Sequence, residues 1–377
     1  MPSPPRLRRA RCLTCYWHDG SFVAHPYPHG TPTALHPVAA EILSAFGDWT
    51  TPEAAAAALD HLTPDTVEEA VQALCSAGLL LAEDEADAGR DARIAGTWGV
   101  WAPEGPFFHY VTSDVPYPEE DAPHEPPPVT ALPPLFTAHP RADRVLLPRR
   151  PQDLRMPYEQ VLHERRTVRD FTRQPVALET LSALLATVFG PVDFIDCGNG
   201  PLYRRTSPAG GARQELEACV GVLNVAGLEP GVYHYNGLQH SLELLSAGLT
   251  REEAGHLCAD QGWAGGAAFL VFVTATLERM SVKYPTPRCY RVCLLNAGHL
   301  GQTFALTATA LGLGPAQTGA FHDSAVAERC RLDNAARIPL YVLAAGHPHP
   351  EQREAPPPAG TAAFRDAVLS SSAPDGG

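Results

Sequence analysis

Two groups of side chains in this chain have types and spacings that could carry chemistry. Lys283 stands directly before Tyr284, and an amine beside a phenol can serve as general acid or base where the surroundings favour the neutral amine. The second group lies in residues 165–169, where three arginines flank the hydroxyl of Thr167. Guanidinium groups bind phosphate bidentately, so this segment is a candidate phosphate site. Taken alone, composition favours the simpler interpretation of each: a solvated lysine beside a core tyrosine, and a solvated basic face.

A long apolar segment follows the Lys-Tyr pair. From Tyr290 to Ala310 the chain has no proline, and no charged residue after Arg291. This pattern predicts a helix that is buried in the protein core. Asn296, His299 and Gln302 recur at spacings of three, so they form one polar stripe on that helix. Buried polar side chains need hydrogen-bond partners.

An irregular loop and a mixed set of elements surround these groups. The Ser-Pro and Gly-Gly steps of residues 207–211 predict a loop whose backbone can approach a flat ligand closely. Because no G-x-G-x-x-G or G-K-[ST] motif is present, a phosphate would not be held by a Rossmann turn or a P-loop. Helices and strands alternate without a regular βαβ rhythm, which predicts an α+β fold with a central, largely antiparallel sheet. The expected elements are helices over 158–163 and 175–189, strands over 216–223, 268–274 and 338–344, and a hairpin over 231–244.

The N-terminal part has a different pattern. Three short helices over 37–46, 51–62 and 63–78, followed by a strand at 79–81, give the outline of a winged helix. The third helix carries acidic residues and no Lys or Arg, so a docking or peptide-binding module fits better than a DNA reader. A purely structural module is the alternative. The aromatic cluster over 98–110 is expected to be a strand and a packing surface.

These patterns divide the chain into five parts. We expect an N-terminal extension, a winged-helix-like domain with the aromatic segment, a Pro-rich linker, a main domain and a flexible tail, over residues 1–30, 31–114, 115–157, 158–350 and 351–377.

Charge and cysteine content limit the class of protein. The formal net charge of −14 argues against partners that need a basic face, which are nucleic acids and anionic membranes. No segment predicts a membrane span, and the N-terminus lacks the apolar stretch of a signal peptide, so a cytoplasmic protein is expected. Cys12 and Cys15 form a C-x-x-C, but no second pair with zinc spacing follows. We therefore expect free thiols and no metal.

Several motifs stand in order along the chain: ERRTVRDF at 164–171, SPAGGAR at 207–213 with Glu217, PGVYHY at 230–235, and AGHLGQ at 297–302 leading to LGLG at 311–314. Together they resemble the FMN-dependent nitroreductase superfamily, and most of all its SagB-type peptide-maturation dehydrogenases. The resemblance covers residues 158–346. It implies a nitroreductase-like α+β fold and an obligate homodimer with FMN at the dimer interface.

The resemblance also implies roles for individual residues. The phosphate and ribityl chain of FMN would be held by Arg165, Arg166, Thr167 and Arg169, with Arg337 as a second phosphate contact. The flavin ring would be lined by Pro208, Ala209, Gly210 and Gly211 on one side and by Gly312 and Gly314 on the other. Lys283 and Tyr284 match the Lys-Tyr pair that azoline-oxidising members use for proton removal.

The sequence departs from the family pattern in two places. Ala209 stands where a second serine is usual, and Gln214-Glu215 replaces the usual His/Tyr-Pro. The first hypothesis is an FMN-dependent dehydrogenase that oxidises azolines of a precursor peptide to azoles, with a cyclodehydratase or other modification enzyme as partner. The alternatives are an NAD(P)H-dependent reductase of small molecules or dehydroamino acids, and a non-catalytic peptide-binding scaffold.

Overall fold

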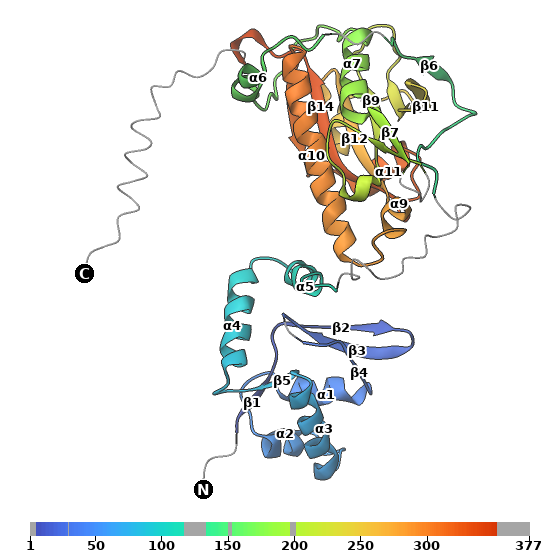
Figure 1. Cartoon of the computed structure of the whole chain (residues 1–377). Helices are drawn as coiled ribbons and strands as arrows, with labels where there is room; N and C mark the ends of the chain where they lie inside the picture. Colours follow the sequence, from blue (N-terminus) through green and yellow to red (C-terminus); the bar gives the residue numbers. More distant parts are fainter. Residues whose placement is uncertain (1–4, 29, 117–132, 150–152, 197–200, 353–377) are drawn as a thin grey trace. The chain divides into compact units, whose positions relative to one another are not determined.

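The computed structural model describes residues 5–28, 30–116, 133–149, 153–196 and 201–352 (Figure 1). The chain divides into two compact units, residues 1–121 and 122–377. The run Glu125–Pro128 of the expected linker and the expected tail from residue 353 onward lie outside the described residues.

The first unit contains the three expected helices. They are α1 (Val38–Ala45), α2 (Pro52–Ala58) and α3 (Pro64–Ser76). Threonine hydroxyls cap the last two: Thr51 accepts from the Ala54 N–H at 3.3 Å, and Thr63 accepts from the Thr66 N–H at 3.2 Å. Each cap precedes a proline at the first helical position, where a missing N–H costs nothing, so local chemistry sets where these helices begin.

Residues 7–26 of the expected N-terminal extension contribute strands to this first unit. Strand β1 (Leu7–Arg9) pairs antiparallel with β5 (Leu80–Ala82), and a separate antiparallel sheet is formed by β2 (Leu13–His18), β3 (Ser21–Pro26) and β4 (Thr33–Leu35). Arg8 and Asp91 form a buried ion pair of 2.7 Å, which ties β1 to the helix that follows β5. Strand pairing and a buried charge pair thus join the first residues to the helices.

The aromatic segment is helical, so the strand expected over 98–110 is wrong. Helices α4 (Ala86–Trp98) and α5 (Glu104–Val111) occupy this region. Phe107 and Tyr110 lie three residues apart, on one face of α5, and both rings pack against Tyr27, with centroids 5.9 and 5.8 Å away. The aromatic content that favours strands in general serves here to attach a helix to β3.

The second unit is built on a seven-stranded sheet in which every neighbouring pair is antiparallel, as predicted. The strand order is β13-β14-β12-β9-β10-β11-β6. The strands are β6 (Arg144–Leu146), β9 (Leu216–Val222), β10 (Gly231–Asn236), β11 (Ser241–Ala247), β12 (Phe269–Thr276), β13 (Gly314–Thr318) and β14 (Arg337–Gly346). A two-stranded sheet, β7 (Asp193–Asp196) with β8 (Pro201–Arg204), lies apart from it.

Helices cover both faces of this sheet. The helices of the second unit are α6 (Tyr158–Glu164), α7 (Leu178–Phe189), α8 (Arg251–Leu257), α9 (Leu277–Ser281), α10 (Arg288–Ala310) and α11 (Asp323–Arg329). Figure 1 shows α7 and α10 side by side. Successive side chains of β9 alternate between two cores: Ala218 and Val220 pack with α7 and α10, whereas Cys219 packs with α8 and α11.

Helix α10 is not buried on every face, which corrects the sequence-based expectation. Asn296 is buried, but His299 and Gln302 of the same polar stripe are exposed in this chain. Leu294 and Leu295 are 43% and 63% exposed. An apolar helix face that this chain leaves open is a feature of protein interfaces.

Residues 133–149 form a strap that crosses the sheet, and buried charged side chains fix its position. The carboxylate of Glu217 accepts the Thr137 N–H at 2.9 Å, and that of Glu243 accepts the His139 N–H at 2.8 Å. His234 lies between the two carboxylates, 3.6 Å from Glu217 and 3.3 Å from Glu243. Burial alone would lower the pKa of His234, but the two carboxylates outweigh it and raise this pKa to about 10. The imidazole is therefore the cation that compensates two buried anions.

Candidate active site

The loop of residues 207–211, which lies between β8 and β9, is held against α10 by hydrogen bonds. The Gly210 N–H donates to the Asn296 side-chain oxygen at 3.2 Å. One turn further along the helix, His299 Nδ1 lies 3.3 Å from the Pro208 carbonyl oxygen. Two members of the polar stripe of α10 thus contact the loop, although only Asn296 of the stripe is buried.

The Lys-Tyr pair lies against the same loop. Gly211 has a φ of +59°, and a Cβ atom placed on it would lie 2.6 Å from the Tyr284 hydroxyl and 3.2 Å from Lys283 Nζ. A Cβ on Gly210 would lie 2.5 Å from Val292 Cγ1. Only glycine allows this approach, so the loop backbone is in direct contact with both groups. The structure therefore brings together two motifs that are about seventy residues apart in the sequence.

Lys283 is unusual in this protein for another reason. It is the only lysine among 377 residues, and every other basic side chain besides histidine is an arginine. Its amine lies 5.4 Å from the centroid of the Tyr284 ring. Lysine carries a primary amine, which can serve as a base or nucleophile in a suitable site, and arginine is not deprotonated in proteins, so a single lysine at this position offers a chemistry that no arginine here can supply. A count of basic residues by type would have singled it out from the sequence.

A buried carboxyl group lies behind the loop. Glu215 is fully buried, and one of its oxygens accepts from the Asn296 amide nitrogen at 2.8 Å. The other oxygen has no hydrogen-bond partner among the described residues. Burial raises the pKa of Glu215, which favours the neutral acid. Sequence reasoning noted Glu215 only as a departure from a family pattern. An acidic residue directly before an apolar strand was a signal that could have pointed to it.

The three arginines of residues 165–169 lie at the other end of α10. The Val168 N–H donates to the Pro315 carbonyl at 2.8 Å, which pins the segment beside β13. Arg166 lines a cavity of about 220 Å³ together with Thr309 and Gly312. Among the described residues, no ion pair or side-chain hydrogen bond involves the guanidinium of Arg165, Arg166 or Arg169. The guanidinium of Arg166, at the cavity, is suited to bind a phosphate.

The remaining predicted residues are placed as follows. Gly314 packs against Val168, because a Cβ on it would lie 2.7 Å from the Val168 side chain, and Gly312 ends α10 with a φ of +75°. Arg337 is the first residue of β14, where its side chain lies 3.8 Å from Asp333. Gly314 pairs with the opposite end of β14, so one chain does not bring Arg337 to the cavity of Arg166.

A single chain thus presents two separate half-sites. The loop contacts α10 at Asn296, whereas the Arg166 cavity includes Thr309. These two positions are thirteen residues apart on α10, which is about 20 Å along the helix axis.

The residues of the two half-sites fit FMN by their chemistry. Free guanidinium groups match its phosphate, and a loop without Cβ atoms at Gly210 and Gly211 allows close approach to a flat ring. An amine and a phenol border that loop and could exchange a proton with a molecule beside it.

Comparison with known proteins identifies the family. The sequence profile named "Nitroreductase family" matches residues 162–347, which include β9 to β14 and both half-sites. A protein of Methanocaldococcus jannaschii, named provisionally as a nitroreductase, is 33% identical over 192 residues, or 50% of this chain and 89% of that protein. The chain belongs to the nitroreductase family, and its second unit has the nitroreductase-like α+β fold.

Two further relatives match less of their own length. The trifolitoxin-processing protein TfxB of Rhizobium leguminosarum bv. trifolii is 32% identical over 165 residues, covering 42% of this chain and 44% of TfxB. A crystal structure from Anabaena variabilis, also named provisionally as a nitroreductase, is 27% identical with a TM-score of 0.49, covering 59% of this chain and 45% of that one. No helix in the described part of the chain is long and apolar enough to cross a membrane.

Two glutamates at the start of β9 should respond oppositely to neutralisation. The raised pKa of Glu215 means that its ionisation destabilises the fold, a cost that grows as the pH rises above about 4.5. Burial would also raise the pKa of Glu217, but His234 and Arg279 hold it well below its usual range. Its ionised form therefore stabilises the fold above about pH 4.5, and this contribution disappears as the pH falls through the lowered pKa.

We therefore expect Glu215→Gln to be as stable as the natural protein at pH 5 and more stable at pH 8. Glu217→Gln should lose about 3–5 kcal/mol at pH 7, because it leaves Arg279 without its buried anion and removes one of the two carboxylates beside His234. Urea unfolding of the three proteins across this pH range measures both effects. Equal destabilisation by the two substitutions would show that the Glu215 carboxyl is also held as a paired anion.

Proposed function

We propose that this protein is an FMN-dependent dehydrogenase that matures a ribosomally made peptide by oxidising an azoline to an azole. The observation that carries the proposal is the contact of Lys283 and Tyr284 with the Gly211 backbone. Oxidation of an azoline removes one proton from the Cα atom, which is bonded to both the ring nitrogen and the carbonyl carbon. It also removes one hydride from the neighbouring ring carbon. Bound FMN would supply the hydride acceptor, and molecular oxygen would be the final electron acceptor.

The protein's own residues would bind, orient and deprotonate. Arg165, Arg166 and Arg169, with the Thr167 hydroxyl, would hold the phosphate and ribityl chain, while the loop from Pro208 to Gly211 would line the flavin ring. Either Tyr284 or Lys283 would take the proton, and the other side chain would assist the one that acts as the base. An amine and a phenolate oxygen can each accept a proton, so both assignments are chemically sound.

A second copy of the chain would complete the site. Within a single chain, the residues assigned to the phosphate and those assigned to the flavin ring lie at opposite ends of α10, about 20 Å apart. Just before Asn296, α10 exposes Leu294 and Leu295, and α6 exposes Tyr158. We propose that two chains pair over this apolar face, so that the arginines of one chain and the loop of the other meet at the cofactor.

The peptide substrate is supported by likeness to TfxB, whose name assigns it to trifolitoxin processing. The first unit, with its acidic third helix, would bind the precursor peptide or a partner such as a cyclodehydratase. The second candidate function is an NAD(P)H-dependent reductase of small molecules, which the relative from Methanocaldococcus jannaschii favours by its name.

Flavin content tests the cofactor assignment. The purified protein is expected to be yellow and to release FMN on heating, as measured by absorbance and mass spectrometry. Arg166→Ala should lower the flavin content, since the phosphate loses a partner at the cavity. The matched control is Arg141→Ala, an exposed arginine of the strap. Unchanged flavin content in the Arg166 variant would remove the phosphate assignment.

Substitution of the Lys-Tyr pair tests the reaction. Lys283→Ala and Tyr284→Phe should keep bound FMN and slow azoline oxidation by about 10²- to 10⁴-fold, measured as loss of two hydrogens from a heterocyclised peptide. Lys283→Arg separates the roles: an arginine preserves the charge but cannot act as a base, so retained turnover assigns the base to Tyr284. Full turnover in all three variants contradicts the proposal, and rapid flavin bleaching by NADPH would favour the reductase.

The exposed face of α10 tests the dimer. Leu295→Glu places a charge on this face and should convert a dimer into a monomer with low flavin content, as seen by light scattering after gel filtration. Leu238→Glu is the control, because Leu238 is 58% exposed on the β10–β11 hairpin, away from α10. A Leu295 variant that stays dimeric and yellow would show that α10 is not the interface.

A further inference from the structure

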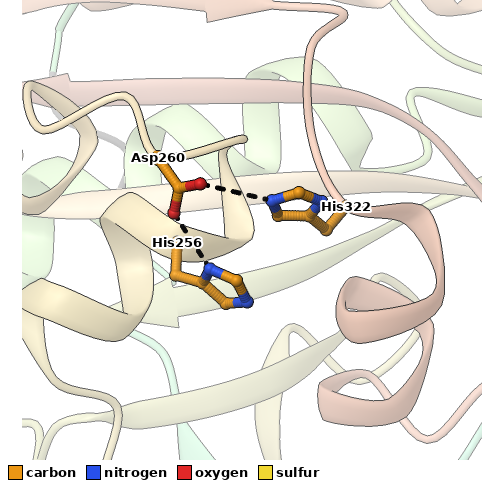
Figure 2. A group of neighbouring side chains, drawn as sticks. All are labelled: His256, Asp260 and His322. Carbon is orange, nitrogen blue, oxygen red and sulfur yellow. Dashed lines mark hydrogen bonds and ion pairs between the residues drawn. The ribbon is translucent and has the colours of Figure 1, made fainter.

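Three side chains of metal-binding type converge on the face of the sheet opposite to α10. His256 lies in the last turn of α8, Asp260 follows that helix, and His322 precedes α11. Asp260 lies between the two rings, with one oxygen 2.9 Å from His256 Nδ1 and the other 3.8 Å from His322 Nε2 (Figure 2). The three ligand atoms are within 4.8 Å of one another.

Backbone contacts hold the three residues in place independently of their side chains. The His322 N–H donates to the Leu257 carbonyl at 2.9 Å, which joins the start of α11 to the end of α8. The Gln261 side-chain amide donates to the carbonyls of Cys258 and Ala320, at 2.8 and 2.9 Å, so the turn after α8 is tied to the segment before His322. The positions from which the three side chains project are therefore fixed before any ligand binds.

The turn itself aims the carboxylate. Ala259 and Asp260 have φ angles of +53° and +60°, the left-handed region that non-glycine residues rarely adopt. Asp260 is one of the residue types that tolerate this conformation best. The reversal of the chain directs its carboxylate back over α8, between the two imidazoles (Figure 2).

We propose that His256, Asp260 and His322 bind one divalent transition-metal ion, with Zn²⁺ as the best fit. Two imidazoles and one carboxylate form a ligand set that suits zinc and its neighbours better than Mg²⁺ or Ca²⁺, which prefer oxygen ligands alone. Ligand atoms bound tetrahedrally to one zinc ion lie about 3.4 Å apart. The separations here bracket that value, and all three side chains are exposed, so rotation of the side chains closes the widest gap.

The ion would act as a brace between α8 and α11 rather than in the proposed flavin reaction. Both helices pack on the core that contains Cys219, whereas the Lys-Tyr pair and its loop contact α10 on the other side of β9. An ion pair of 2.9 Å between Arg329 and Glu253 already joins the same two helices further along. A metal at the three residues would add a second connection, at the end of α8 and the start of α11.

Calorimetric titration of the full chain with ZnCl₂, after removal of metal with EDTA, tests the site. We expect one bound Zn²⁺ that raises the melting temperature. Loss of an outer-shell partner weakens metal affinity by about 10- to 100-fold, and loss of a ligand costs at least as much. His322→Ala and Asp260→Asn should each show this loss, and neither should melt higher when zinc is added.

His61→Ala is the matched control, since His61 is an exposed histidine paired with one glutamate at 2.9 Å and lies outside the cluster. It should bind zinc as the natural protein does. Melting temperatures without metal check that each variant folds. If the natural protein binds no zinc, or if the His322 and Asp260 variants bind it unchanged through cysteines or other groups, the site does not exist.

Discussion

The amide of Asn296 is the side chain on which the geometry of the site depends. Its oxygen accepts the Gly210 N–H, and its nitrogen donates to the buried carboxyl of Glu215. One side chain of α10 thus holds both the loop and Glu215, the residue that precedes β9. A buried amide that has both its donor and its acceptor satisfied is rigid, because any rotation would leave two polar groups unpaired. The position of Gly211, and with it the contact to Lys283 and Tyr284, follows from that constraint.

The sheet that supports this site is unusually polar at its centre. Glu217, Glu243 and His234 lie on neighbouring strands, and Arg279 joins them from α9. Each anion is compensated, and each also accepts a backbone N–H from the strap of residues 133–149. A hydrophobic contact could hold the strap anywhere along the sheet, whereas these charge-assisted hydrogen bonds specify one position. Arg279 lies four residues before Lys283, so the same network also fixes the helix that leads to the Lys-Tyr pair.

The sequence predicted most of the fold where local patterns decide it. Alternation and apolar runs located β9, β10, β12 and β14, and threonine-proline steps located α2 and α3. Prediction failed where tertiary contacts decide. The aromatic residues of α5 have a high strand propensity, but they pack as a helix against Tyr27. The exposure of His299 depends on which face of α10 meets the sheet.

The candidate site shows the same division. Motif likeness singled out the arginines, the loop and the Lys-Tyr pair as candidates, but no spacing in the sequence could place Arg337 at the far end of β14 from Gly314. Glu215 was undervalued because its significance lies in a missing partner, which only a structure reveals. The cluster of His256, Asp260 and His322 was missed because its third member lies sixty-two residues further along and joins the others only through the packing of two helices.

Because the chain has only one lysine, the candidate site can be labelled selectively by amine chemistry. Apart from the chain's amino terminus, the amine of Lys283 is the only primary amine in the molecule, and it is exposed beside the loop. An amine-directed dye, crosslinker or reductive methylation reagent would therefore label this position alone among all side chains. A protease specific for lysine would cut the unfolded chain once, between Lys283 and Tyr284, and bound cofactor or peptide could be detected as protection of a single bond.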